Sequence, residues 1–96
     1  LANGTANCIQ TTDGFVLLKG SKIHKESASS LAKGIKKKAE QSRANGEIVD
    51  DTVQSDKIFA SSSAAAAFAV GYSISGPQAW KSDNGETLKS IESKKA

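Results

Sequence analysis

Residue types that usually build active sites and disulfide frameworks are scarce in this chain. Its 96 residues include one cysteine, one histidine, one tryptophan, one proline and no methionine. A single cysteine excludes an internal disulfide, whereas small secreted domains usually carry several. One cysteine and one histidine also cannot complete a structural zinc site. We therefore expect a cytoplasmic protein that needs neither a metal nor another cofactor.

The few reactive side chains do not converge on a catalytic site. His24 stands between lysines in a polar segment, and Cys8 has apolar neighbours typical of a core thiol. Asp50 and Asp51 are adjacent, so an extended chain would point their carboxylates in opposite directions. No nucleotide-binding or calcium-binding loop motif occurs. The sequence therefore predicts that the domain has no catalytic residue and is not an enzyme by itself.

The length and the uncharged segments favour one small domain without a membrane span. The longest uncharged run, Ile58 to Trp80, holds five serines and a proline, which makes it a poor transmembrane helix. Ninety-six residues suit a single domain. Because the chain starts at Leu1 and contains no methionine, we expect residues 1–96 to be one accessory domain from the C-terminal part of a larger protein.

Positive charge is concentrated in one segment. Residues 19–43 hold eight basic and two acidic side chains, a local balance of +6, whereas residues 44–59 hold one basic and four acidic ones, a balance of −3. Residues 60–79 carry no charge. A basic segment of this density is typical of a nucleic-acid-binding surface. The alternative is a solvated helix face that serves only solubility.

The first half of the chain predicts a β-hairpin and a basic helix. Residues 5–9 and 15–18 favour strands, and the Asp13-Gly14 pair between them suits a turn. A helix is expected to begin near Ser27 and to end at Asn45-Gly46. Its apolar stripe would hold residues 28, 31, 32, 35 and 39, with Lys33, Lys36 and Lys37 off the stripe.

The second half predicts a buried helix framed by short elements. Residues 47–56 suit a short strand or loop, and residues 57–59 a second short strand. Residues 61–71 form an alanine-rich helix with almost no polar face, which must therefore be buried. A strand is expected at residues 78–81, after the Ser75-Gly76-Pro77 turn, and Thr87 can cap a last helix. The predicted fold class is α+β, with an antiparallel sheet of three or four strands packed on both helices.

Two features of this second half could bind nucleic acid or could be purely structural. Ser61, Ser62 and Ser63 begin the alanine-rich helix, where hydroxyls and free amides can bind a phosphate or simply cap the helix. Trp80 beside Lys81 could offer a ring to a base and a cation to a phosphate. The only tryptophan of a small domain could equally be a core residue.

Several phrases together resemble a known group of domains. They include Asp13-Gly14-Phe15-Val16-Leu17-Leu18-Lys19-Gly20-Ser21, Ile58-Phe59-Ala60-Ser61-Ser62-Ser63 with the alanines that follow, Gly71-Tyr72-Ser73, Trp80-Lys81, and Asp83-Asn84-Gly85-Glu86-Thr87-Leu88-Lys89. In this order they resemble the domain of unknown function found C-terminal to GIY-YIG nuclease domains in bacterial proteins. The second half also resembles the RAMA domain of restriction enzymes and adenine methylases. The resemblance implies a module fused to DNA-processing enzymes, with a role in recognising DNA, including modified DNA.

Charge and resemblance lead to one expected function. The domain is expected to bind DNA, as a duplex, and to position a covalently attached catalytic domain. The alternative is a protein-interaction or structural module. The candidate nucleic-acid-binding residues are Lys19, Ser21, Lys22, Lys25, Lys33, Lys36, Lys37, Ser61, Ser62, Ser63, Trp80 and Lys81.

Overall fold

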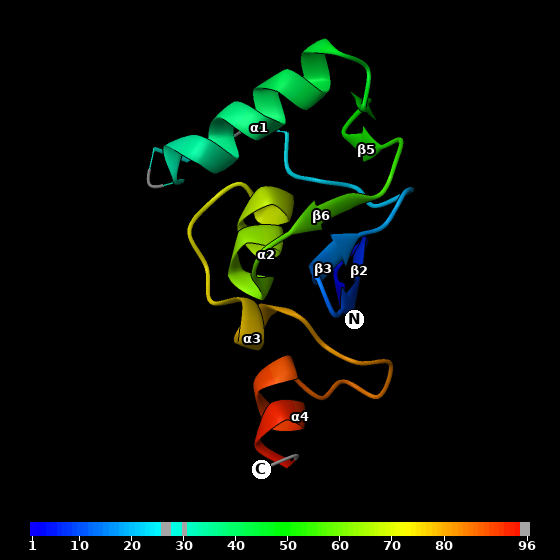
Figure 1. The fold of residues 1–96 in the computed structure, drawn as a ribbon, viewed down its shortest axis with the longest axis vertical. Coiled ribbons are helices and arrows are strands. Elements are labelled where there is room, and N and C mark those ends of the chain that lie inside the picture. Colours follow the sequence, from blue (N-terminus) through cyan, green and yellow to red (C-terminus); the bar gives the residue numbers. More distant parts are fainter. Residues whose placement is uncertain (26–27, 30, 95–96) are drawn as a thin grey trace.

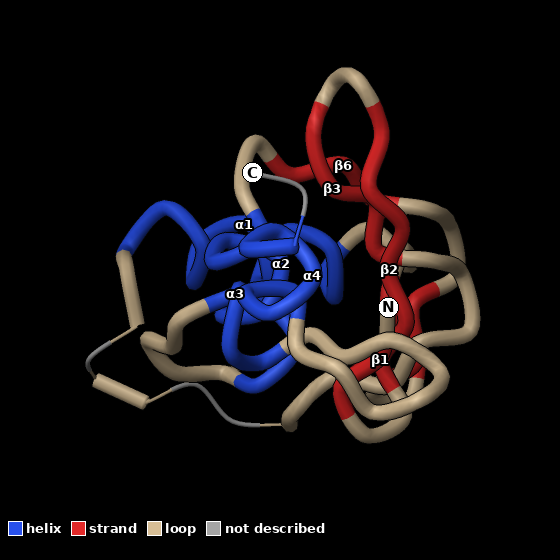
Figure 2. The backbone as a smooth tube through the Cα atoms, turned by 90° about the horizontal axis from the view of Figure 1, so that it is seen from below, coloured by secondary structure: helices blue, strands red, loops and turns tan. Residues whose placement is uncertain are grey.

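A four-stranded antiparallel sheet covered on one side by helices forms the body of the domain (Figures 1 and 2). The computed structural model describes residues 1–25, 28–29 and 31–94. The elements in chain order are β1 (Ala2–Asn3), β2 (Ala6–Thr11), β3 (Gly14–Leu17), α1 (Lys33–Ala44), β4 (Ile48–Val49), β5 (Thr52–Val53), β6 (Lys57–Phe59), α2 (Ser62–Val70), α3 (Gly76–Ala79) and α4 (Leu88–Lys94). The predicted α+β class is confirmed.

The main sheet has the strand order β1-β2-β3-β6 and contains the predicted hairpin. Strands β2 and β3 pair from Cys8↔Leu17 to Thr11↔Gly14, and β3 pairs with β6 through Phe15↔Phe59. Gly14 allows this last pairing, because its φ is +140° and a Cβ there would lie 2.2 Å from the Phe59 carbonyl oxygen. No L residue with a side chain fits that position without moving β6.

The alanine-rich helix α2 occupies the centre of the core, as predicted. Ala65 and Ala66 are fully buried, and Phe68 packs against Phe59 of the sheet with ring centroids 5.1 Å apart. Small side chains let the helix approach the sheet closely. Gly71 ends the helix in the left-handed conformation, at φ 83°, as expected of a C-terminal glycine.

The basic helix begins later than predicted. Its first residue is Lys33, and Ser27, the expected start, lies outside the described residues. Ala28 lies before the helix because its amide donates to the carbonyl oxygen of Gly71, while the His24 amide donates to that of Ala69. These two hydrogen bonds use free carbonyl groups at the end of α2, and they hold His24 and Ala28 against that helix. The predicted end is confirmed, since Asn45 is the C-cap.

The predicted strand at residues 78–81 is wrong. Gly76–Ala79 forms the helical turn α3, and Lys81 makes only isolated bridges to Ala2 and Thr87. Pro77 lies in the first turn of α3, where its missing N–H is not needed and its fixed φ suits a helix. Pro77, expected in a turn before a strand, therefore lies at the start of a helix.

Two smaller elements complete the fold. Residues 47–56 contain a two-stranded hairpin, β4–β5, whose turn residues Asp50 and Asp51 have φ values of 50° and 60°. Before α4, the Thr87 hydroxyl accepts a hydrogen bond from the Ser90 amide at 3.2 Å, so the predicted cap is confirmed. Within the described residues, no helix has both the length and the apolar character needed to cross a membrane.

Candidate nucleic-acid interface

The exposed face of α1 carries three of the predicted lysines. Lys33, Lys36 and Lys37 are all exposed, whereas Ala39 and Ser42 on the opposite face are buried. At about 100° per residue the three lysines fall within an arc of roughly 100°. None of the three forms an ion pair within the part of the chain that the structure describes. Glu40 is exposed on the same face, which leaves the face with an excess of two positive charges.

The N-cap residue of α1 has no polar side chain to cap the helix. Ala32 occupies the N-cap position, and the first turn contains no acidic residue. Among the residues that the structure describes, no side chain caps the amides of this turn, which lie beside Lys33 and Lys36. Lys33 opposes the helix dipole, which disfavours cations at an N-terminus. The charge of Lys33 therefore does not stabilise α1.

Other cations of the basic segment are bound by internal partners. Arg43 pairs with Asp51 at 2.6 Å, and its guanidinium also donates to the carbonyl oxygen of His24 at 3.1 Å. This contact fixes the 22–25 loop against α1 and the β4–β5 turn. Lys57, in the acidic segment, is buried and pairs with Glu47 at 3.2 Å. The local charge balance therefore overstates the positive charge that is available to a ligand.

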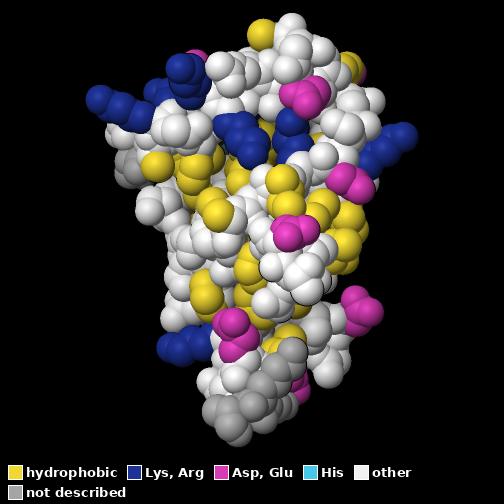
Figure 3. All heavy atoms as spheres, in the orientation of Figure 1, with side chains coloured by type: hydrophobic (Ala, Val, Ile, Leu, Met, Phe, Trp, Pro, Cys, Tyr) yellow, Lys and Arg dark blue, Asp and Glu magenta, His cyan; other side chains and the backbone are white. Residues whose placement is uncertain are grey.

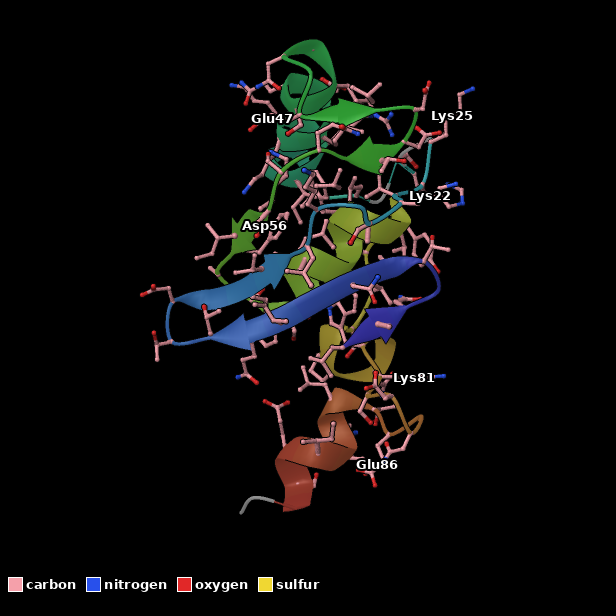
Figure 4. All side chains as sticks on the ribbon, turned by 90° about the vertical axis from the view of Figure 1, so that its right-hand side faces the viewer. Lys22, Lys25, Glu47, Asp56, Lys81 and Glu86 are labelled. Carbon is pink, nitrogen blue, oxygen red and sulfur yellow. The ribbon has the colours of Figure 1, made fainter. Side chains whose placement is uncertain are left out.

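The loop lysines are exposed, but they do not all lie near α1. Lys22 and Lys25 lie at the α1 end of the molecule, whereas Lys81 lies toward the α4 end (Figure 4). Lys19 is exposed, and its amide donates to Asp56 at 2.8 Å. In Figure 3, most Lys and Arg side chains on the visible face gather at the α1 end, with Asp and Glu among them.

Ser21 has a structural role, which corrects its assignment to the binding site. The side chain is buried, and its hydroxyl accepts from the Asn7 amide at 3.0 Å and donates to the Asn7 carbonyl at 3.2 Å. Both hydrogen bonds hold the loop after β3 against β2. The hydroxyl therefore has no access to a nucleic acid.

At the start of α2, Ser61 caps the helix, and Ser63 binds helix α3 instead. The Ser61 hydroxyl accepts from the Ala64 amide at 3.1 Å, and the Ser63 hydroxyl accepts from the Gly76 amide at 3.0 Å. Ser62 is buried, and a Cβ on Gly76 would lie 2.2 Å from its carbonyl carbon. The hydroxyls of Ser61 and Ser63 therefore already have internal partners, and Ser62 is buried, whereas Ser61 remains exposed.

Trp80 belongs to the core, so it offers no surface for base stacking. The side chain is fully buried, and its Nε1 donates to the Ser62 carbonyl oxygen at 3.0 Å. Of the two roles that the sequence left open for Trp80, the structure shows the core role. Its neighbour Lys81 is exposed.

One polar cluster was missed by sequence reasoning. Lys38 lies on the inward side of α1, 4.3 Å from the centroid of the Phe59 ring, and donates to the Ile58 carbonyl oxygen at 3.1 Å. Burial, and then the nearby charge of Lys57, lower the pKa of Lys38. Helical spacing could have predicted the inward position of Lys38. Residue 38 follows residue 35 by three positions and precedes residue 42 by four, so all three lie on the same side of the helix.

Cys8 is buried in the core, and its thiol is the one titratable group with a strongly raised pKa among the described residues. Burial raises the pKa of the Cys8 thiol from 9.0 to about 11, so the thiol is protonated at neutral pH. Residues 1–25, 28–29 and 31–94 contain no group of three or more His, Cys, Asp or Glu side chains that could hold a metal ion. The buried, protonated thiol of Cys8 is a poor nucleophile.

Comparison with known proteins gives one match. Residues 2–92 match a family described as "Domain of unknown function (DUF4357)". No protein of curated function and no solved structure matches the chain. The match covers nearly the whole chain, from β1 into α4. The chain therefore belongs to the DUF4357 family of domains of unknown function.

Proposed function

We propose that this domain is a non-catalytic module that binds duplex DNA through the exposed face of α1 and positions a covalently attached DNA-processing domain. The observation that supports the proposal is the set of three exposed lysines in α1, which form no ion pair with the described residues and lie at a helix start where Ala32 provides no side-chain cap. Lysines and free amides are the groups that contact phosphate oxygens in protein–DNA complexes. Such contacts carry no base information, so the proposed binding is largely independent of sequence.

The size of this face suits several phosphate contacts. Helix α1 has 12 residues, and it is about 18 Å long at 1.5 Å per residue. Lys22 and Lys25 are exposed at the same end of the molecule and could add contacts beyond the helix (Figure 4). Three to five contacts correspond to a dissociation constant on the order of 10⁻⁴–10⁻⁶ M at physiological salt.

The experiment compares two double variants that each lose two positive charges. Lys33→Gln/Lys37→Gln removes charge from the exposed face of α1, and Lys81→Gln/Lys89→Gln removes it from the α4 end. Fluorescence anisotropy with a labelled duplex at low salt measures both. The first variant should bind about tenfold more weakly than the second. Equal weakening would show that only net charge matters, and it would contradict the α1 interface.

A second arm of the experiment tests recognition of modified DNA, which the RAMA resemblance suggests. The same duplex is compared with and without adenine methylation. Tighter binding to the methylated duplex would support a reader role. Equal binding would leave the role of positioning the attached domain.

A protein-interaction role is the second candidate, and one surface favours it. On the outer face of the sheet, Ile9, Val16 and Ile58 are neighbours across three strands. Ile9 is 46% exposed and Ile58 is 51% exposed. Contiguous exposed apolar side chains are typical of contact surfaces. Absence of DNA binding even at low salt would favour this role.

A further inference from the structure

Strand β6 is the free edge of the main sheet, and the register shows which of its backbone groups face outward. The Leu18 amide donates to the Asn7 carbonyl oxygen across β2 and β3. Hydrogen-bonded pairs alternate along an antiparallel ladder, so Val16 also bonds toward β2. Its neighbours Phe15 and Leu17 therefore bond toward β6. The N–H and C=O groups of Ile58, opposite Val16, must point away from the sheet.

Lys38 covers this outward-facing position. Its ammonium group donates to the Ile58 carbonyl oxygen at 3.1 Å, and its nitrogen lies 4.3 Å from the Phe59 ring centroid. A charged side chain placed at an edge strand is a known way to prevent another strand from pairing there. Any incoming strand would have to displace the ammonium group to reach this carbonyl.

Charge at the same edge acts against a second copy of the chain. Lys38 and Lys57 face one carboxylate, that of Glu47, so the cluster carries an excess positive charge. Two copies joined at β6 would bring these excess charges together. Without the charge of Lys38, the remaining Lys57–Glu47 pair is neutral, and this repulsion is gone.

The apolar row on the outer face ends at this edge and favours a second copy as the partner. Ile9, Val16 and Ile58 follow one another across β2, β3 and β6. Two copies related by a twofold axis would pair antiparallel through Ile58 and would join their two rows into one. We propose that β6 is a self-pairing edge that Lys38 keeps closed, and that neutralising Lys38 allows a dimer to form through β6.

The first test measures the molar mass of the full chain by light scattering over a wide range of protein concentrations. Lys38→Met removes the charge and the donor but keeps an aliphatic stem over Phe59. We expect twice the 10.0 kDa mass of the chain for this variant. The unchanged chain, Lys38→Arg and the control Lys37→Met, on the exposed face of the same helix, should remain monomeric.

A second pair of variants separates strand pairing from apolar adhesion. Lys38→Met/Ile58→Pro removes the outward N–H, and proline is tolerated at an edge where that N–H faces solvent. It should return the protein to a monomer. Lys38→Met/Ile58→Thr keeps the amide and a β-branched side chain, and should remain a dimer.

Three results would overturn the proposal. They are a monomeric Lys38→Met variant at every concentration, a dimer that survives Ile58→Pro, and a dimer of the unchanged chain. Thermal melting followed by circular dichroism confirms that each variant is folded. If Lys38→Met does not melt cooperatively, Lys38→Gln carries the same test with the same outcomes.

Discussion

Gly76 is the position where one added methyl group should have the largest effect. It begins α3, and a Cβ there would lie 2.2 Å from the Ser62 carbonyl carbon and 2.3 Å from the Ser63 nitrogen. Both neighbours are backbone atoms of α2, so neither can move aside cheaply. To relieve the clash, α3 must shift away from α2. The shift would stretch the Gly76–Ser63 and Trp80–Ser62 hydrogen bonds, each 3.0 Å long.

The expected cost of Gly76→Ala follows from these contacts. Two weakened hydrogen bonds cost roughly 0.5–1.5 kcal/mol each, and overpacking costs about 1–3 kcal/mol. Alanine also lowers the conformational entropy of the unfolded chain, which stabilises the folded state by about 0.4–1 kcal/mol. The clash therefore outweighs the gain, and the net loss is about 3 kcal/mol. For a domain of this size that lowers the melting temperature by roughly 12–24 °C.

Gly34→Ala provides a control with the opposite sign. Gly34 lies in α1, and a Cβ there would meet nothing within 4 Å. Alanine should stabilise this exposed helix position by about 0.5–1 kcal/mol. Urea denaturation followed by circular dichroism measures both variants. A Gly76→Ala variant as stable as the unchanged chain, or an equal loss for Gly34→Ala, would refute the packing of α3 on α2.

Three further predictions test other parts of the fold. Gly14→Ala should cost more than 2 kcal/mol, because strain at φ +140° adds to the clash with the Phe59 carbonyl oxygen, and a thermal melt measures the loss. The raised pKa of Cys8 should make stability fall as the pH rises from 9 to about 11, since the folded state holds the proton more tightly. Urea midpoints at both ends of this range should show a smaller fall for Cys8→Ala. A double-mutant cycle of Arg43→Gln and Asp51→Asn should give a coupling of about 0.5–1 kcal/mol in urea denaturation, and a coupling of zero would contradict the ion pair.

The elements that could be predicted from the sequence are those with strong local signals. The turn at Asp13-Gly14 between two apolar runs was enough to predict the β2–β3 hairpin. Consecutive alanines without a polar face were enough to predict that α2 is buried. In both cases the local preference and the packing agree.

The errors occur where a distant segment decides the local conformation. Ala28 leaves the expected helical course because its amide binds the carbonyl oxygen of Gly71 at the end of α2, more than 40 residues away in sequence. Pro77 is compatible with a turn before a strand or with a helix start, and only the contact with α2 decides between them. Such pairings cannot be read from one window of sequence.

The binding site was predictable only in part, for the same reason. The exposed lysines of α1 follow from helical spacing, and the structure places them on one face. Ser21 and Trp80 were included because of their chemistry, but both are buried by contacts with distant residues. Arg43 was counted in the basic segment, although its charge is paired with Asp51. Charge density along a sequence does not show which charges are already neutralised.

The dependence of DNA affinity on salt tests the proposed function most directly. For three to five phosphate contacts, a plot of log K against log salt concentration should have a slope of about −2.7 to −4.5. Lys33→Gln/Lys36→Gln/Lys37→Gln should flatten this slope by about 2.7 if each lysine contacts one phosphate. An unchanged slope in the triple variant, or no binding to a duplex at the lowest salt, would contradict the account.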